Sequence, residues 1–368
     1  MVMGRRPDVP TASVPVTAVD TVGLAQQLGA ALIRVPFRRP LRGQSNPAAN
    51  VATAVTREVL RTFMGYSSSL PIDEFRSIEV LLDDLCRVVM QPVVASHQVA
   101  QRRTEFGGVP GILYTPKDRA PDGVILYLHG GGYIGTSPTM YSFFTARLCQ
   151  ATNCTIFVAD YRLAPEFPYP AGVEDTVAAL TALVELGAPP SRLLVAGDSG
   201  GGGLANSLLL EAPTRLSIDP PVGLLLFSPE VDLLLDEPSV TENAPRDILP
   251  WNIPTAAYLH GADATNVEIT TVDADVAGFP PTFVCWGGDE MFRDPIRRFV
   301  GRLAAAGVPH EAHESPGMFH VFPILMPWAT ASRVVYREAT RFVRAVLDDA
   351  TPIPSHALPA VSSAAGFA

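Results

Sequence analysis

The stretch LLVAGDSGGGGLA, residues 193–205, passes from strand-forming residues directly into four consecutive glycines at the place where a helix should begin. Glycine costs about 1 kcal/mol per residue in a helix relative to alanine, so the run needs a structural reason. Residues 197–201 fit the pattern G-x-S-x-G between a strand and a helix, which is the setting of a nucleophile elbow. There a serine occupies strained backbone with its hydroxyl above the sheet, and small neighbours let the turn close. The stretch therefore predicts a nucleophile at Ser199.

Strand-like and helix-like segments alternate on both sides of this stretch. The strand candidates are continuous apolar runs, typical of strands buried on both faces, at residues 123–130, 155–161, 192–198, 222–229 and 281–288. Helix-length segments lie between them, at residues 140–152, 171–186 and 294–307. This alternation predicts an α/β fold, a mostly parallel sheet with helices on both sides.

Three parts of the chain do not follow this alternation of strands and helices. Residues 1–95 have apolar residues at spacings of three and four without strand candidates, which predicts a helical segment. Residues 230–275, rich in prolines and acids, are predicted to be an insertion in a main domain that spans residues 96–350. Residues 351–368, rich in Pro, Ala and Ser, are predicted to be a flexible tail.

A second glycine-rich motif, HGGGY, follows the strand candidate 123–130 at residues 129–133. Glycines that leave a strand expose backbone N–H groups, the donors that stabilise a developing oxyanion. A phosphate-binding loop is the alternative, but no Lys-Ser/Thr pair follows the glycines. Together with the elbow, the motif indicates acyl-transfer chemistry.

A serine hydroxyl needs an imidazole to accept its proton and an acid to orient that imidazole. The histidine candidate is His320 in SPGMFHVF (315–322), after the strand candidate HEAHES (310–315). The acid candidates lie in DEMFRD (289–294). His260, in the predicted insertion, is a candidate for lining a pocket. Four other histidines are interpreted as structural or solvated: His97, His310, His313 and His356.

Four motifs in this order make the chain resemble the hormone-sensitive-lipase family of α/β-hydrolases, the bacterial family IV esterases. They are HGGGY (129–133), DYRLAPEFPYPA (160–171), GDSGGG (197–202) and GMFHVF (317–322), with SPEVDL (228–233) as weaker support. The resemblance covers most of residues 97–350. It implies the α/β-hydrolase fold with a helical cap over the pocket, formed by residues 1–95 and 230–275.

The resemblance also implies roles for individual residues. Ser199 matches the nucleophile and His320 the general base. The backbone N–H groups of Gly131, Gly132 and Gly200 match the oxyanion hole. The remaining matches are implied to be supports: His129 and Asp198 beside these groups, and Tyr161, Arg162 and Glu166, which brace the sheet and loops.

The acid and two glycines depart from the family pattern. The family's D-x-L-R-D is E-M-F-R-D here, so Glu290 is the matching position and Asp289 its rival. Either carboxylate can hold an imidazole tautomer. Gly200 stands where alanine is usual and Gly203 where asparagine is common. Gly203 has no evident role, so it is predicted to tolerate alanine best.

The predicted function is a serine carboxylic-ester hydrolase for short- to medium-chain acyl esters, which needs no metal or organic cofactor. Phe63, Met64, Trp251 and Tyr258 are candidates to line an apolar entrance or to be plain core. Two alternatives remain. One is a hydrolase of the same mechanism that prefers amide, N-acetyl or lactone bonds. The other is a non-catalytic small-molecule receptor. The presence of Ser199, His320 and an acid argues against the receptor.

The composition of the chain indicates which partners and which cellular location to expect. The net charge of −10 and pI near 5.2 argue against nucleic acid or anionic lipid as partners. The basic residues Arg34, Arg38, Arg39 and Arg42 are interpreted as a solvated face. No run of 18 apolar residues occurs, so stable membrane insertion is not expected. Asp8, Asp20 and two prolines interrupt a signal-peptide pattern, and the four cysteines form no metal or disulfide motif, so a cytoplasmic location is expected. A homodimer remains open.

Overall fold

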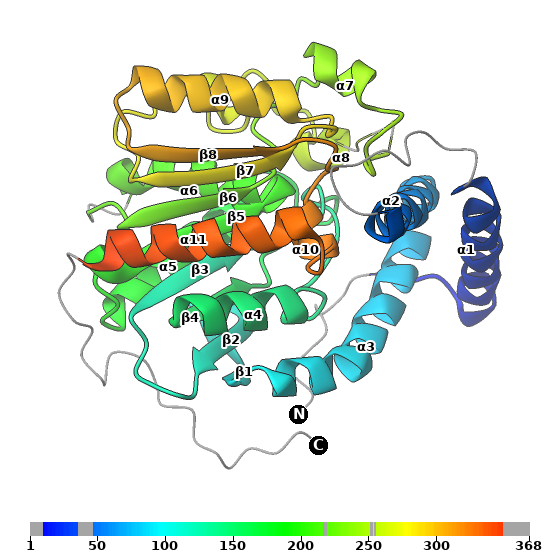
Figure 1. The fold of residues 1–368 in the computed structure, drawn as a ribbon, viewed down its shortest axis with the longest axis horizontal. Coiled ribbons are helices and arrows are strands. Elements are labelled where there is room, and N and C mark those ends of the chain that lie inside the picture. Colours follow the sequence, from blue (N-terminus) through cyan, green and yellow to red (C-terminus); the bar gives the residue numbers. More distant parts are fainter. Residues whose placement is uncertain (1–9, 36–46, 216–218, 251–252, 254, 349–368) are drawn as a thin grey trace.

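A computed structural model describes residues 10–35, 47–215, 219–250, 253 and 255–348. Its centre is an eight-stranded sheet with the order β1-β2-β4-β3-β5-β6-β7-β8 (Figure 1). From β4 onward in this order, each strand pairs in parallel with its neighbour. β1 and β2 form an antiparallel hairpin, and β2 also runs antiparallel to β4. The strands are β1 (Val99–Phe106), β2 (Val109–Pro116), β3 (Gly123–Leu128), β4 (Cys154–Ala159), β5 (Leu193–Asp198), β6 (Gly223–Phe227), β7 (Thr282–Gly287) and β8 (His310–Ser315). This confirms the mostly parallel α/β sheet.

Helices cover both faces of the sheet, as the continuous apolar strands predict. The buried residues of β5 alternate between two cores: Leu193 and Val195 face one, and Leu194 and Ala196 face the other. The first core is completed by α5 (Ala171–Glu185), α6 (Ser199–Arg215) and α9 (Arg293–Ala305). The second is completed by α4 (Ser142–Thr152), the short α10 (Phe322–Leu325) and α11 (Thr330–Asp348). Each strand from β3 to β7 is therefore buried along its whole length.

The β1–β2 hairpin lies before the first strand candidate, at residues 123–130, and was not predicted. It turns at Gly107 and Gly108, whose φ angles are +61° and +77°, the left-handed region that a tight hairpin turn requires. β1 lies at the edge of the sheet, and its burial is uneven along the strand. An edge strand of this kind contains polar residues and lacks the continuous apolar signal.

Three helices precede the sheet, as the spacing of the first 95 residues predicts: α1 (Val14–Arg34), α2 (Pro47–Ser67) and α3 (Ile72–Ser96). They pack together at one end of the molecule (Figure 1). By length and composition alone, α1 is the one helix in the described ranges that could cross a membrane. It lies mostly on the surface and exposes Val14, Val19 and Ile33.

The described residues between 230 and 275 contain no strand, and their helices are short. α7 spans Pro238–Glu242, α8 spans Thr255–Leu259, and a single 3₁₀ turn spans Thr271–Asp273. The predicted tail, residues 351–368, and Trp251 lie outside the described residues. The assignment of residues 1–95 and 230–275 as a cap stays a prediction.

The glycine run forms the start of α6, and the backbone of other loops passes close to it. A Cβ on Gly201 would lie 2.1 Å from the carbonyl oxygen of Leu128, at the end of β3. A Cβ on Gly203 would lie 2.3 Å from the Tyr133 hydroxyl and 2.6 Å from the carbonyl oxygen of Glu230. The expectation that Gly203 tolerates alanine best is therefore wrong, because backbone occupies that space. Gly200, whose nearest contact would be at 3.1 Å, has the most room of the four.

We predict that Gly203→Ala lowers the free energy of unfolding by about 1–3 kcal/mol, the usual cost of forcing a methyl group into a packed site. Gly200→Ala is the matched control in the same helical turn, and we expect it to cost less than about 1 kcal/mol. Urea denaturation followed by circular dichroism measures both. Equal stability of the two variants would contradict the prediction.

Candidate active site

Ser199 lies at the turn between β5 and α6, above the carboxyl end of the sheet. Its φ angle is +50°, in the left-handed region that residues with a side chain rarely adopt. The turn can close because a Cβ on Gly197 would lie only 2.3 Å from the carbonyl oxygen of Gly201, a space that only glycine leaves open. The strained backbone and its glycine neighbours are the geometry that the G-x-S-x-G pattern predicts.

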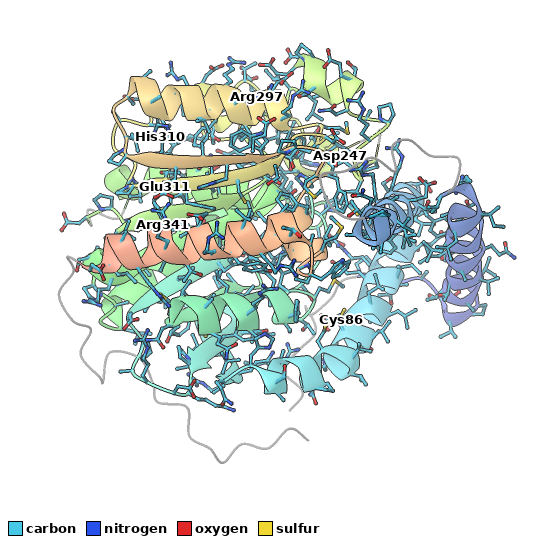
Figure 2. The ribbon with its side chains drawn as sticks, in the orientation of Figure 1. Cys86, Asp247, Arg297, His310, Glu311 and Arg341 are labelled. Carbon is cyan, nitrogen blue, oxygen red and sulfur yellow. The ribbon has the colours of Figure 1, made fainter. Side chains whose placement is uncertain are left out.

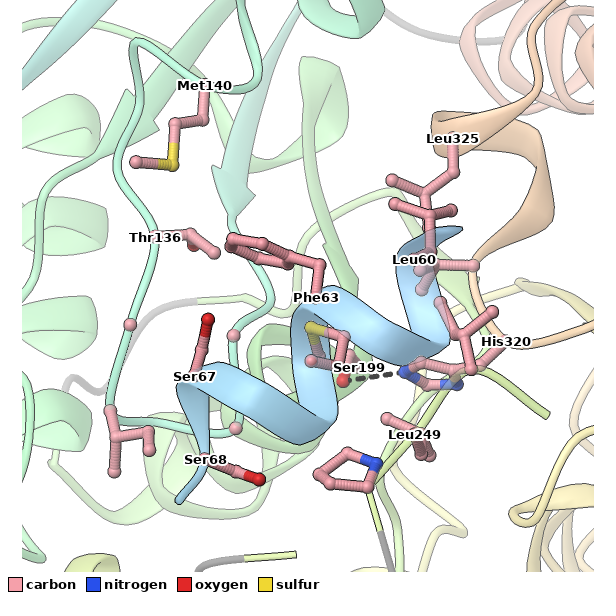
Figure 3. A pocket seen from close by; sticks show the side chains of 18 of the residues that line it. Leu60, Phe63, Ser67, Ser68, Thr136, Met140, Ser199, Leu249, His320 and Leu325 are labelled. Carbon is pink, nitrogen blue, oxygen red and sulfur yellow. Dashed lines mark hydrogen bonds between the residues drawn. The ribbon is translucent and has the colours of Figure 1, made fainter. Parts of the chain in front are cut away.

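His320 follows β8 in the loop before α10 and reaches Ser199 from across the sheet. Its Nε2 lies 2.9 Å from Ser199 Oγ, the contact drawn as a dashed line in Figure 3. The Phe292 ring meets the imidazole edge-on, at 5.1 Å between centroids. Burial lowers the pKa of His320, although the carboxylates of Asp247 and Asp198 oppose this shift. A neutral imidazole that can accept a proton from a hydroxyl is thereby favoured.

Glu290, the matching acid position, is the carboxylate that the structure brings beside His320. It is fully buried, and its Oε2 lies 3.5 Å from His320 Nδ1. Asp289 instead points toward α2, with its Oδ2 3.6 Å from the Arg57 guanidinium. Burial raises the pKa of Glu290 to about 8, although the Ser228 hydroxyl favours its ionised form. The Oε2–Nδ1 separation is longer than a strong hydrogen bond, as is common at such sites before a substrate is bound.

Asp247, which the sequence reasoning missed, ties the loops of Glu290 and His320 together. Its Oδ1 accepts a hydrogen bond from the backbone N–H of His320 at 2.9 Å, and its Oδ2 accepts one from that of Met291 at 2.7 Å. The side chain is completely buried, at the end of β7 and β8 that faces α2 (Figure 2). In the sequence, Asp247 is one of many acidic residues between positions 230 and 275, and nothing in its neighbourhood distinguishes it.

The loop after β3 runs beside the start of α6. Gly131 and Gly132 have φ angles of +124° and +60°, which glycine adopts freely. Gly200 lies against this loop, since a Cβ on it would be 3.1 Å from the Tyr133 nitrogen and 3.4 Å from Gly132 Cα. Within the described ranges, the N–H groups of Gly131, Gly132 and Gly200 donate to no protein acceptor. Three donors near Ser199 are thus available to an oxyanion.

Asp198 anchors that loop to the sheet. Its Oδ1 accepts hydrogen bonds from the Tyr127 hydroxyl at 2.7 Å and from the Gly130 N–H at 3.0 Å. Its Oδ2 accepts one from the Tyr141 hydroxyl at 2.8 Å. Burial raises the pKa of Asp198 to about 6, although these hydrogen bonds oppose the shift. The carboxyl therefore connects the loop after β3 to the end of β5.

His129 is fully buried and takes part in the same support. Its ring stacks on Tyr161 at 4.5 Å between centroids, and the Tyr161 hydroxyl donates to the His129 carbonyl at 2.5 Å. Glu166 pairs with Arg76 of α3 at 2.6 Å, and Arg76 also donates to the carbonyl oxygen of Ala164 at 2.8 Å. These contacts connect the DYRLAPEF segment to the N-terminal helices.

Arg162 is the exception among the predicted braces. Its half-exposed side chain pairs with Asp175 at 2.8 Å and with Glu174 at 3.2 Å, on the surface of α5. It therefore fixes its own segment to a helix, and it lies away from the cavity.

A cavity of about 290 Å³ opens beside Ser199 and His320 (Figure 3). Its lining is mainly apolar and comes from α2, α3, the residues before α8 and the His320 loop, and it includes Leu60, Phe63, Met64, Ile78, Leu249 and Leu325. Phe63 and Met64 thus line the pocket as expected. Tyr258 does not; it is buried and stacks on Tyr133 at 3.9 Å between centroids.

Other expected residues lie elsewhere. His260 is exposed at the end of α8, and His310 lies on β8, far from Asp247 in Figure 2. His356 falls outside the described residues. Among the described residues, no three His, Cys, Asp or Glu side chains are grouped so that they could hold a metal ion. All four cysteines are free thiols.

Comparison with known proteins decides the family. A model of the α/β-hydrolase fold matches residues 125–324. The chain is 34% identical to an acetyl-hydrolase of Streptomyces hygroscopicus and 35% identical to the carboxylesterase NlhH of Mycobacterium tuberculosis. These matches cover 60% and 61% of this chain and 75% of each relative. This protein belongs to the bacterial hormone-sensitive-lipase family of α/β-hydrolases.

Solved structures agree with that membership. A hormone-sensitive lipase from a metagenome library superposes with a TM-score of 0.70 at 33% identity, over 79% of this chain and 98% of that one. The family homologue EstE7, also from a metagenome library, gives a TM-score of 0.65 at 34% identity, over 74% of this chain and 98% of its own. The hydrolase is thus an ester hydrolase of the carboxylesterase type.

We predict that Glu290→Gln stabilises the hydrolase relative to the wild type at pH 8 and much less at pH 5. The raised pKa means that the folded state keeps its proton while the unfolded state loses it above its ordinary value of 4.5. The wild type therefore loses stability as the pH rises from about 4.5 to 8, whereas glutamine has no proton to lose.

Melting temperatures at the two pH values measure this effect. Ser199→Ala is the control, because it changes the same site without removing a carboxyl group. If the melting temperatures of Glu290→Gln and the wild type differ by the same amount at both pH values, the prediction is contradicted.

Proposed function

We propose that the enzyme hydrolyses short- to medium-chain acyl esters through a covalent acyl-enzyme on Ser199. The observation that supports this most directly is the 2.9 Å contact between Ser199 Oγ and His320 Nε2 at a strained elbow turn. Ser199 is 7% exposed and lines the apolar cavity, so a substrate carbonyl can reach it there.

In the first half of the reaction Ser199 Oγ attacks the ester carbonyl carbon while His320 Nε2 takes the serine proton. The carbonyl oxygen becomes an oxyanion that accepts hydrogen bonds from the N–H groups of Gly131, Gly132 and Gly200. The carbon–oxygen bond of the ester then breaks, and His320 returns its proton to the leaving alcohol. The acyl group remains on Ser199.

In the second half a water molecule attacks the acyl-enzyme. His320 takes one proton from the water, the oxyanion forms again, and the bond to Ser199 breaks as the proton passes to Oγ. The carboxylic acid leaves and the serine is restored. No group other than the protein and water takes part.

Glu290 is the proposed triad acid. Its carboxylate faces Nδ1, the imidazole nitrogen opposite to the one near Ser199, so it can hold the reactive tautomer and stabilise the imidazolium. That role requires the ionised carboxylate. Because burial raises the pKa of Glu290, turnover is expected to increase as the pH rises toward about 8.

The size of the cavity supports the proposed chain length. At about 290 Å³ it lies at the small end of the range for small-molecule sites. Its apolar lining suits a hydrocarbon acyl chain, which gains about 0.8 kcal/mol for each buried CH₂ group.

We predict that the wild type hydrolyses p-nitrophenyl acetate and butyrate much faster than the palmitate, and that Ser199→Ala lowers turnover by several orders of magnitude. A fluorophosphonate probe should label the wild type on Ser199 and leave the variant unlabelled. p-Nitroanilide and lactone substrates measure the competing bond preference. Faster cleavage of those substrates, or activity that survives in Ser199→Ala, would contradict the proposal.

We also predict that Glu290→Ala lowers kcat by several orders of magnitude, because the imidazolium loses its partner. Asp289→Ala is the matched control at the adjacent position and should cost little. Steady-state kinetics with p-nitrophenyl butyrate gives both values. The reverse ranking would make Asp289 the triad acid.

A further inference from the structure

Glu230 is a buried carboxyl group in the active-site cavity that the proposed mechanism does not use. It follows β6, and its backbone N–H donates to the carbonyl oxygen of Ser199 at 2.9 Å. The residue is therefore fixed relative to Ser199. It lines the same cavity as Ser199 and His320.

Glu230 is only 1% exposed, and its Oε1 has no hydrogen-bond partner among the described residues. Burial raises the pKa of Glu230 to about 8, and the nearby Asp232 adds to the shift. Tyr133 and Tyr258 are the other titratable groups that interact with this carboxyl. At neutral pH the carboxyl is therefore protonated, with one O–H donor and one carbonyl acceptor.

Packing alone gives no reason for such a group. A buried polar atom without a hydrogen bond lowers the stability of the fold, and an apolar side chain of similar size would not have this cost. The rest of the cavity lining is mainly apolar. Glu230 is one of the few polar residues of this lining, and a small number of polar groups in an apolar pocket is the usual means of fixing the orientation of a polar ligand.

We propose that Glu230 forms a polar subsite that binds a hydroxyl group of the substrate, so that the preferred esters carry a hydroxyl besides the ester itself. This inference rests on the proposed esterase function and names its substrate class. A protonated carboxyl suits a hydroxyl because each group both donates and accepts a hydrogen bond. An ammonium group would instead require the ionised carboxylate in a cavity that disfavours charge.

The test compares esters in which a hydroxyl replaces a methyl group of nearly the same size. On the acyl side the pair is p-nitrophenyl 3-hydroxybutyrate and p-nitrophenyl 3-methylbutyrate. On the alcohol side it is 2-hydroxyethyl butyrate and propyl butyrate. The measured quantity is the ratio of kcat/KM within each pair, for wild type, Glu230→Leu and Glu230→Gln.

We expect the wild type to prefer the hydroxylated ester in one of the two pairs by about tenfold or more, the scale of a hydrogen bond in a buried site. Glu230→Leu should lose this preference and keep its activity on the methyl ester. Glu230→Gln keeps a donor and an acceptor and should retain most of the preference. A variant that only loses stability would have a lower kcat/KM for both esters of a pair by the same factor, so the ratio would not change.

Identical ratios in all three proteins would overturn the inference while leaving the esterase function intact. Failure of the wild type to hydrolyse any of the four esters would overturn the proposed function instead. A preference for p-nitrophenyl 3-aminobutyrate that is lost in both variants would also overturn the inference, because it would identify Glu230 as an ammonium site.

Discussion

The close approach of three backbone segments around the first turn of α6 is the constraint on which the site depends. The end of β3, the loop after β6 and the helix itself approach so closely that Gly201, Gly202 and Gly203 have no space for a Cβ atom. This packing sets Ser199 beside the loop of Gly131 and Gly132, and the backbone N–H of Glu230 donates to the Ser199 carbonyl oxygen. The helix forms despite the poor helix propensity of glycine, because its glycine positions are buried and packed closely against neighbouring segments.

Contacts from the N-terminal helices and from residues 230–275 fix the loops that carry the site. Arg57 of α2 donates to the carbonyl oxygen of Gly317 in the His320 loop, and Arg61 donates to that of Asp247. Arg76 of α3 binds the carbonyl oxygen of Ala164 and the Glu166 carboxylate. Segments far apart in the sequence therefore determine where the reacting groups lie, so the geometry of the site is a property of the whole fold.

Much of the fold could be predicted because its signals are local. Continuous apolar runs identified the central strands, and G-x-S-x-G and HGGGY predicted the turns at residues 197–201 and 129–133. The hairpin β1–β2 was not predicted in this way, and for β1 the reason is that an edge strand has a weaker apolar pattern. Asp247 and the constraint on Gly203 could not be predicted either. Both depend on contacts between segments that are tens of residues apart in the sequence, which composition and spacing do not report.

The glycine run also limits how the protein can change over evolutionary time. Every missense mutation of a glycine codon adds at least a Cβ atom, so at Gly201, Gly202 and Gly203 even the smallest replacement meets neighbouring atoms. Those neighbours are partly backbone, which no second mutation of a side chain can remove. Lineages descended from this enzyme can therefore diversify along the cavity wall, where side chains provide the contacts, while the turn beneath it stays nearly invariant.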